Sequence, residues 1–334
     1  MFLILAGLLL TGICSRAVAW AADPVRVGYF ANITHAQALV GKANGEYERR
    51  LGTKVEWKAF NAGPSAMEAL LAGALDITFV GPNPAVNAYL RSKGKALTII
   101  AGAAGGGACL VVRPEAGIRS PADFRGKRIA SPEFGNTQDV ALRHWLKSNG
   151  LTPGKDVQVL PTKNPDILML FQQKQLAAAW VPEPWVARLV QEGGGRIFLD
   201  ERSLWPGGQF TTAVVVARSD FLQRNRPLVR KFLEAHVDVT RGINQKPAEA
   251  KRIINEELAR TVRKPLPTAV LDDAFGRLTI TYDPLSQPLL VAARHAADLG
   301  LLPAAAAQQR ELTALFDLAL LNEVLKARRL PSVR

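Results

Sequence analysis

The sequence predicts an α/β protein of two similar lobes joined by a pair of crossing strands. Three observations predict it: a βαβαβ pattern occurs twice, its copies are offset by roughly 101 to 104 residues, and each copy continues into a glycine-bearing link and a β-rich run. Short strands that alternate with helices are typical of parallel sheets covered by helices, and they argue against an all-α or all-β architecture. The 334 residues also suffice for two domains, each with its own core.

The first copy of the pattern occupies residues 23–80. Apolar and alternating runs predict its strands, and apolar residues at helical spacing predict its helices. The predicted order is strand 25–29, helix 34–50, strand 54–60, helix 65–72 and strand 75–80. The second copy repeats this order with strand 127–130, helix 137–148, strand 157–160, helix 165–174 and strand 176–180.

Beyond each copy the chain continues in a matching way. We predict further strands at 97–101 and 197–199, glycine-bearing links at 102–107 and 206–208, and β-rich runs at 108–113 and 212–218. From residue 220 onward the pattern is mostly helical. One apolar stripe consists of Leu228, Phe232, Ala235, Val239 and Ile243, and residues 304–329 are predicted as one last amphipathic helix. We expect these helices to return to the first lobe.

The composition excludes several classes of protein. With 48% hydrophobic and 21% charged residues the chain is neither disordered nor a polytopic membrane protein, since no stretch beyond the N-terminus is apolar for the ~18 residues that a span needs. The net charge of +13 favours anionic partners, without choosing among nucleic acids, membranes and small anions.

The N-terminal residues 1–21 are predicted to be a secretory signal peptide. An apolar run at 2–13 is followed by the A-x-A match Ala19-Trp20-Ala21. Cys14 lies in this segment, so the mature chain keeps only Cys109 and has no internal disulfide. We therefore expect a soluble, exported protein.

Polar side chains follow the first strand of each copy. Asn32, Thr34 and His35 stand at the first strand-to-helix turn, and Asn136, Thr137 and Gln138 stand at the matching turn of the second copy. Ligands of open parallel sheets bind beyond the carboxyl ends of the strands, where helix N-termini present unpaired N–H groups. Any one of these residues could be a plain helix cap. Their recurrence in register predicts a site that holds an anion with neutral donors.

A second pair of matched turns follows the third strand of each copy, where Asn83 and Glu183 each stand between two prolines. Either turn could contact a ligand or be only a turn. The Glu183 carboxylate would repel an anion unless it faces away or the ligand also carries an amine. Trp185 could wall the apolar part of a ligand or pack in a core. Gly106 and Gly107 could let the backbone approach a ligand or flex a hinge.

Catalytic motifs are absent from the sequence, which contains no G-x-S-x-G, P-loop, H-E-x-x-H or paired cysteines. The four histidines are scattered, and Cys109 lies in an apolar run where an inert core role fits best. The basic residues follow no RNA-binding or helix-turn-helix pattern. We therefore expect no catalytic residue, metal site, cofactor or nucleic-acid partner.

Several short runs together resemble a known family. These runs are Val27-Gly28-Tyr29-Phe30, Thr34-His35-Ala36, Phe60-Asn61-Ala62-Gly63-Pro64, Ala72-Gly73-Ala74-Leu75-Asp76, Gly81-Pro82-Asn83-Pro84-Ala85, Gly135-Asn136-Thr137-Gln138 and Glu183-Pro184-Trp185. Over nearly the whole mature chain they resemble the periplasmic substrate-binding proteins of ABC importers, in the nitrate, taurine and aliphatic-sulfonate group.

The resemblance implies a two-lobed periplasmic-binding-protein clamshell of type II with two crossover hinge strands. The repeat offset and the two β-rich links predict lobe I at residues 23–105 plus 213–334, and lobe II at residues 107–212. The resemblance further implies a monomeric, periplasmic, non-enzymatic protein that closes on a small anionic solute and then docks on an ABC permease in the inner membrane. Carried over by position, the ligand contacts would be Thr34, His35, Asn83, Gly106, Gly107, Asn136, Thr137, Gln138, Glu183 and Trp185.

The ligand that we expect is a small organic oxyanion, an aliphatic sulfonate or taurine. Taurine has a specific rationale, because its ammonium could pair with the Glu183 carboxylate while its sulfonate binds at the N-terminus of the helix that starts near Thr137. Two alternatives stay open. One is a nitrate- or bicarbonate-binding protein of the same group, and the other is a thiamin-pyrimidine or menaquinone-pathway enzyme on the same fold.

Overall fold

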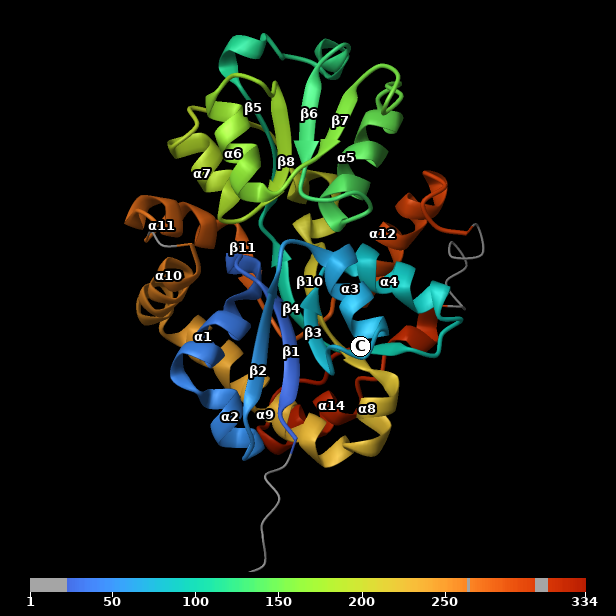
Figure 1. Ribbon diagram of the computed structural model, residues 1–334, viewed down its shortest axis with the longest axis vertical. Coiled ribbons are helices and arrows are strands. Elements are labelled where there is room, and N and C mark those ends of the chain that lie inside the picture. Colours follow the sequence, from blue (N-terminus) through green and yellow to red (C-terminus); the bar gives the residue numbers. More distant parts are fainter. Residues whose placement is uncertain (1–22, 263–264, 304–311) are drawn as a thin grey trace, which may run out of the picture.

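The computed structural model describes residues 23–262, 265–303 and 312–334, and it has two lobes that lie one above the other (Figure 1). Each lobe is built around its own sheet, and helices cover both faces of that sheet. This is the mixed α/β, two-lobed architecture predicted from the repeated pattern. The predicted signal peptide at 1–21, with Cys14, lies outside the described residues.

The first lobe contains a six-stranded sheet in the order β11-β4-β10-β3-β1-β2. Strand β1 runs parallel to β2 and β3, whereas β10 runs antiparallel to β3 and β4. The strands are β1 (Val25–Phe30), β2 (Val55–Phe60), β3 (Ile77–Val80), β4 (Leu97–Gly106), β10 (Thr211–Arg218) and β11 (Leu278–Ile280). The helices of this lobe are α1 (Ala36–Asn44), α2 (Glu46–Leu51), α3 (Gly63–Leu71), α4 (Pro82–Arg91), α8 (Ser219–Arg224), α9 (Arg226–Gln245), α10 (Pro247–Val262), α11 (Thr268–Gly276), α12 (Ser286–Asp298) and α14 (Ala319–Ala327).

The second lobe contains a five-stranded sheet in the order β7-β6-β8-β5-β9. Strand β6 runs parallel to β7 and β8, whereas β5 runs antiparallel to β8 and β9. The elements are β5 (Ala108–Val112), β6 (Arg128–Ser131), α5 (Thr137–Ser148), β7 (Gln158–Pro161), α6 (Asn164–Gln172), β8 (Ala178–Pro182), α7 (Trp185–Gln191) and β9 (Arg196–Asp200). The two parallel triplets, β1–β3 and β6–β8, are the two copies seen in the sequence.

The chain passes between the lobes at two places. The first passage is the step from β4 to β5 through Gly106 and Gly107, which both adopt left-handed φ values of 70° and 69°. A Cβ atom at Gly107 would also lie 2.3 Å from a Leu278 methyl carbon. This crossing therefore needs glycine both for its left-handed backbone and because no side chain fits there. The return passage leads from β9 through two short 3-10 turns, Glu201–Leu204 and Pro206–Gly208, to β10.

The structure corrects four element predictions. Residues 102–106, predicted as part of a glycine-bearing link, instead continue strand β4, because they pair with β10 and β11. The predicted helix 34–50 is instead a 3-10 turn followed by α1 and α2, because left-handed Gly45 (φ 67°) ends one helix and begins the other. The predicted turn around Asn83 is the first turn of α4, where proline suits the N-terminal helical positions. The predicted helix 304–329 is not continuous: beyond residues 304–311, which are not described, Phe316 pairs with Ile99 of β4 before α14 starts.

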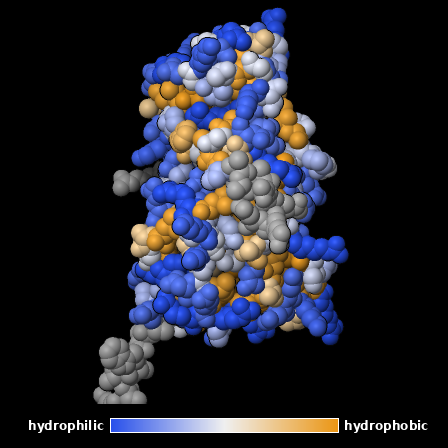
Figure 2. Space-filling view, turned by 90° about the vertical axis from the view of Figure 1, so that its right-hand side faces the viewer, coloured by the Kyte–Doolittle hydropathy of each residue, from blue (hydrophilic) through white to orange (hydrophobic). Residues whose placement is uncertain are grey.

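The helices after β10 return to the first lobe, as predicted. The apolar stripe of α9 places Phe232, Ala235, Val239 and Ile243 in the core on one face of the first sheet, and Leu228 packs at its margin. Helix α14 adds Leu321 and other residues to the same core. No helix among the described residues is long and apolar enough to span a membrane. The face shown in Figure 2 is largely hydrophilic, with smaller apolar areas between the polar side chains.

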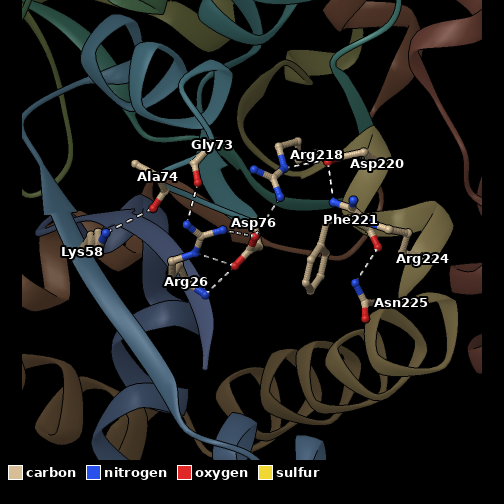
Figure 3. Close-up of polar contacts among 10 residues, drawn as sticks. All are labelled: Arg26, Lys58, Gly73, Ala74, Asp76, Arg218, Asp220, Phe221, Arg224 and Asn225. Atoms are coloured by element: carbon tan, nitrogen blue, oxygen red, sulfur yellow. Dashed lines mark hydrogen bonds and ion pairs between the residues drawn. The ribbon is translucent and has the colours of Figure 1, made fainter. Parts of the chain in front are cut away.

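An ion-pair network ties the first lobe together at one end of its sheet (Figure 3). Buried Asp76 accepts hydrogen bonds from Arg26, with oxygen-to-nitrogen distances of 2.6 and 2.9 Å, and lies 3.3 Å from Arg218. Arg218 in turn pairs with Asp220. Arg26, Asp76 and Arg218 line a hollow of about 670 Å³, and all three are engaged in ion pairs with one another. We therefore read this network as an anchor of β1, β3 and β10.

Candidate functional site

Four helix N-termini from the two lobes meet around one small cavity. The start of α1, the first residue of α3 and the residue before α4 line it from the first lobe, and the start of α5 lines it from the second. The lining residues are Phe30, Asn32, Thr34, His35, Gly63, Gly81, Pro84, Asn136, Thr137, Gln138, Pro182 and Thr212. Helix N-termini carry unpaired N–H groups and the positive end of the helix dipole, so this arrangement suits an anion.

His35 lines the cavity as a neutral ring. Its Nδ1 atom accepts a hydrogen bond from the backbone N–H of Phe30 at 3.1 Å, and its ring stacks on that of Phe30 with centroids 4.3 Å apart. Complete burial lowers the pKa of His35 to about 3. Since Nδ1 is the acceptor, the proton of the neutral ring belongs on Nε2, which makes His35 a neutral hydrogen-bond donor.

Thr137 brings an unsatisfied hydroxyl to the cavity. Asn136 caps α5 by accepting a hydrogen bond from the Asp139 N–H at 2.8 Å, which fixes the first turn of the helix. The Oγ1 atom of the next residue, Thr137, is buried without a hydrogen-bond partner. An unsatisfied buried hydroxyl costs about 1 to 3 kcal/mol, so a ligand that accepts from Thr137 would remove this cost.

The cavity is small and carries no side-chain charge. Its volume is about 20 Å³, close to the space of one water molecule. None of its lining residues, all in the described part of the chain, is Lys, Arg, Asp or Glu. Positive potential at the site therefore comes from helix dipoles and oriented N–H groups.

The lobes are closed around the cavity. Trp185 of α7 donates from Nε1 to the Asn32 side-chain oxygen at 3.0 Å, joining the second lobe to the turn after β1. Asn61, after β2, donates to the carbonyl oxygen of Pro132 at 3.3 Å. A solute larger than the cavity can therefore enter only when the lobes separate.

Glu183 does not face the cavity. Its buried carboxylate lies 2.5 Å from Arg277 Nε and accepts from the Ala187 N–H at 3.1 Å. Burial raises the pKa of Glu183 to about 7, against the opposing pull of Arg277. Because Arg277 lies between α11 and β11 of the first lobe, this ion pair connects the lobes. The expected ammonium partner of the ligand is thus already engaged by an arginine.

The remaining predicted contacts lie around the cavity rather than in its lining. Asn83 donates from Nδ2 to the carbonyl oxygen of Ala292 at 3.0 Å, which holds α4 against α12. Gly106 and Gly107 form the first crossing, where Thr212 Oγ1 donates to the Gly106 carbonyl oxygen. Trp185 reaches the site only through Asn32. Of the ten predicted contacts, five line the cavity: Thr34, His35, Asn136, Thr137 and Gln138.

Comparisons with known proteins agree with this architecture. The sequence profile of the NMT1-like family matches residues 21–257. The chain belongs to the NMT1-like family. It is 29% identical over 224 residues to the taurine-binding periplasmic protein of Escherichia coli (strain K12), a match that covers 66% of this chain and 67% of that protein.

Solved structures with the same fold include two binding proteins. The alkanesulfonate-binding protein SsuA from Xanthomonas axonopodis pv. citri, bound to MOPS, superposes with a TM-score of 0.71 at 22% identity and covers 90% of this chain and 100% of its own. The periplasmic nitrate-binding protein NrtA from Synechocystis PCC 6803 has a TM-score of 0.78 at 18% identity, with 93% and 91% covered. The resemblance noted in the sequence is thus confirmed at the level of the family.

Sequence reasoning missed several lining residues. Gly63 carries no side chain that signals chemistry, and it contributes a helix start and space instead. Gly81 and Pro84 line the cavity from the turn in which only the Asn83 side chain was expected to make contact. Thr212 comes from the returning crossing strand β10, and the matching strand β5 has Ala108 near its start, so no polar side chain recurs there. Asn32, which the sequence places in the same turn as Thr34 and His35, also lines the cavity, although it is not among the ten contacts carried over from the resemblance.

Proposed function

We propose that this chain is the extracytoplasmic solute-binding component of an ABC importer, located in the periplasm, and that it binds a small organic oxyanion of the aliphatic-sulfonate class between its lobes. The observation that carries this proposal is the convergence of four helix N-termini and the unsatisfied Thr137 hydroxyl on one cavity. The relatives and structural neighbours named for binding taurine, alkanesulfonate and nitrate support the same ligand class.

The lining favours an oxyanion without a positive group. A sulfonate presents three acceptor oxygens, which match the Thr137 hydroxyl and the unpaired N–H groups of the helix starts. Taurine would also bring an ammonium, and no carboxylate lines the cavity to receive it. The Glu183 carboxylate is held by Arg277. An unsubstituted alkanesulfonate therefore fits the site better than taurine.

Nitrate is the second candidate. The closed cavity of about 20 Å³ favours the smallest oxyanion, since an alkyl tail needs further room. The nitrate-binding protein NrtA shares the fold. Binding of nitrate in preference to ethanesulfonate would assign the chain to this alternative.

In this proposal the two lobes close on the solute, and the chain catalyses no reaction. Lobe I comprises residues 23–105 plus 213–334 and lobe II residues 107–212, with the two crossings as the hinge. A ligand that touches both lobes binds the closed form better and shifts the population toward it. The closed, monomeric complex then docks on an ABC permease in the inner membrane.

Native mass spectrometry of the purified protein tests the proposal, because a closed cavity retains solute from the host. The expected result is a retained small oxyanion on the wild type and on Thr268→Ala, a variant of an exposed helix start, with loss of that solute from Thr137→Ala. Retention of a molecule without an oxyanion group, or of a compound that the protein converts into another, would overturn it.

A further inference from the structure

Two histidines from different lobes stack on one another beside the closed cleft. The rings of His144, on α5, and His295, on α12, have centroids 3.7 Å apart and an angle of 11° between their planes. Helix α5 packs on the second sheet and α12 on α4 of the first lobe, so this ring stack exists only while the lobes are together. Beside it, Lys147 of α5 donates to the carbonyl oxygen of Asp298 at 2.5 Å.

We infer that the His144–His295 stack is a proton-sensitive latch, which holds the lobes together while both rings are neutral and releases them when the rings are protonated. Neutral imidazoles stack face to face, whereas two imidazolium ions at this separation repel. The inference rests on the proposed function in one respect, since it takes closure to accompany solute binding. Its consequence is a solute affinity that falls in acid.

The surroundings of the stack favour the neutral rings. Burial lowers the pKa of both histidines, that of His295 to about 4, and the His144 ring lowers the pKa of His295 further. Lys147 and Arg294 act in the same direction, and Asp298 opposes them. Trp205, with its ring centroid 5.7 Å from that of His295, covers the stack with an apolar face.

The other elements packed here add little net charge to the stack. Helix α4 contributes Arg91, which is exposed at its end. The 3-10 turn before Trp205 contributes Glu201, whose carboxylate is bonded by Trp180, and Arg202, which is paired with Asp200. Among the described residues, Asp298 is the only carboxylate that raises the pKa of either ring, so it alone can compensate the charge of a protonated stack.

The direction of the pH effect follows from the lowered pKa values. An imidazole freed by opening returns toward its ordinary pKa of 6.5, while in the closed form the pKa of His295 is about 4. The closed form is therefore fully favoured above pH 6.5 and loses this advantage as the pH falls toward 4. For His295 alone, protonation at pH 5.0 shifts the equilibrium between the closed and open forms roughly 30-fold toward the open form.

Titration calorimetry with ethanesulfonate at pH 7.5 and pH 5.0 tests the latch by comparing wild type, His295→Gln and Lys231→Gln. Glutamine keeps a neutral polar side chain without the titration, and Lys231→Gln removes an exposed charge on α9, outside the stack, as the control. Glu183 also titrates in this range, but it is retained in all three proteins. We expect wild type and Lys231→Gln to lose roughly 30-fold more affinity on acidification than His295→Gln does.

An equal loss of affinity in wild type and His295→Gln would overturn the latch. If ethanesulfonate does not bind at pH 7.5, the proposed ligand fails, and the latch is then decided by proton NMR titration of the two imidazoles in the wild-type chain. A pKa of His295 well below 6.5 supports the buried, stacked arrangement of the two rings. A pKa of 6.5 or above in that titration overturns the latch.

Discussion

Gly81 of the first lobe and Thr137 of the second lobe touch across the cavity, and a Cβ atom at position 81 would lie 2.2 Å from Thr137 Oγ1. Gly81 has an ordinary extended backbone with φ −72° and ψ 156°, so glycine is required there by the opposite lobe and not by the chain itself. The closed form therefore has no room for a side chain at position 81.

Gly81→Ala is therefore expected to hinder closure while leaving each lobe folded. Overpacking of this kind costs about 1 to 3 kcal/mol, which corresponds to a loss of solute affinity of roughly 5- to 150-fold. The measurement is titration calorimetry with ethanesulfonate. Gly242→Ala, in α9 with nothing within 4 Å of the added atom, is the control and should bind like wild type. Equal affinities of Gly81→Ala and Gly242→Ala would show that the lobes do not close as described.

Thr137→Ala should weaken binding without weakening the ligand-free fold. A hydrogen bond to a charged group contributes ~1.5 to 3 kcal/mol, so we expect the dissociation constant to rise by roughly 10- to 150-fold. The Thr137 hydroxyl has no partner in the unliganded site, hence its removal should not lower the melting temperature. Thr268→Ala, at the exposed start of α11, is the matched control. Unchanged affinity in Thr137→Ala would refute the placement of the anion at α5.

Half of the predicted site contacts reach the cavity, and the other half show where sequence reasoning ends. Thr34 and Thr137 follow the first strands of the two repeats, so the repeat itself brings them to facing sheet edges. Asn83 and Glu183 also occupy matched turns, but their partners, Ala292 and Arg277, come from helical segments at least 90 residues further along the chain. No local pattern indicates those contacts. The crossing strands, by contrast, could be predicted because glycine marks the first one.

Trp185→Phe tests the hydrogen bond between the lobes from Trp185 to Asn32, a residue that lines the cavity. Loss of the indole N–H leaves the Asn32 side-chain oxygen without its 3.0 Å donor in the closed form, at a cost of about 1 to 3 kcal/mol. We expect weaker ethanesulfonate binding with little change in the melting temperature of the ligand-free protein. Trp57→Phe is the control, because Trp57 donates to Glu48 at 2.9 Å within the first lobe. Trp57→Phe should lower the melting temperature and leave the affinity for ethanesulfonate unchanged. Unchanged affinity in Trp185→Phe with weakened affinity in Trp57→Phe would contradict the closure account.

Glu201→Gln should make the protein more resistant to alkali. Complete burial raises the pKa of Glu201 to about 8, and Trp180 donates to its carboxylate at 2.8 Å. Because this pKa is raised in the folded state, the stability it confers is fully present below pH 4.5 and is lost as the pH rises through 8. Between pH 6 and 9 the wild type should lose about 2 to 3 kcal/mol of unfolding free energy relative to Glu201→Gln. Denaturant unfolding measures this, with Glu249→Gln, at an exposed position, as the control; parallel profiles for wild type and Glu201→Gln would contradict it.

The most direct test of the central claim is titration calorimetry of the ligand-free protein with ethanesulfonate, taurine, nitrate, bicarbonate and an aminopyrimidine in turn. A site built from helix N-termini, with Glu183 already paired to Arg277, predicts that ethanesulfonate binds and that taurine binds more weakly. Nitrate binding in place of ethanesulfonate would select the second candidate within the same anion site. Binding of the aminopyrimidine alone, or of none of the oxyanions, would contradict the account.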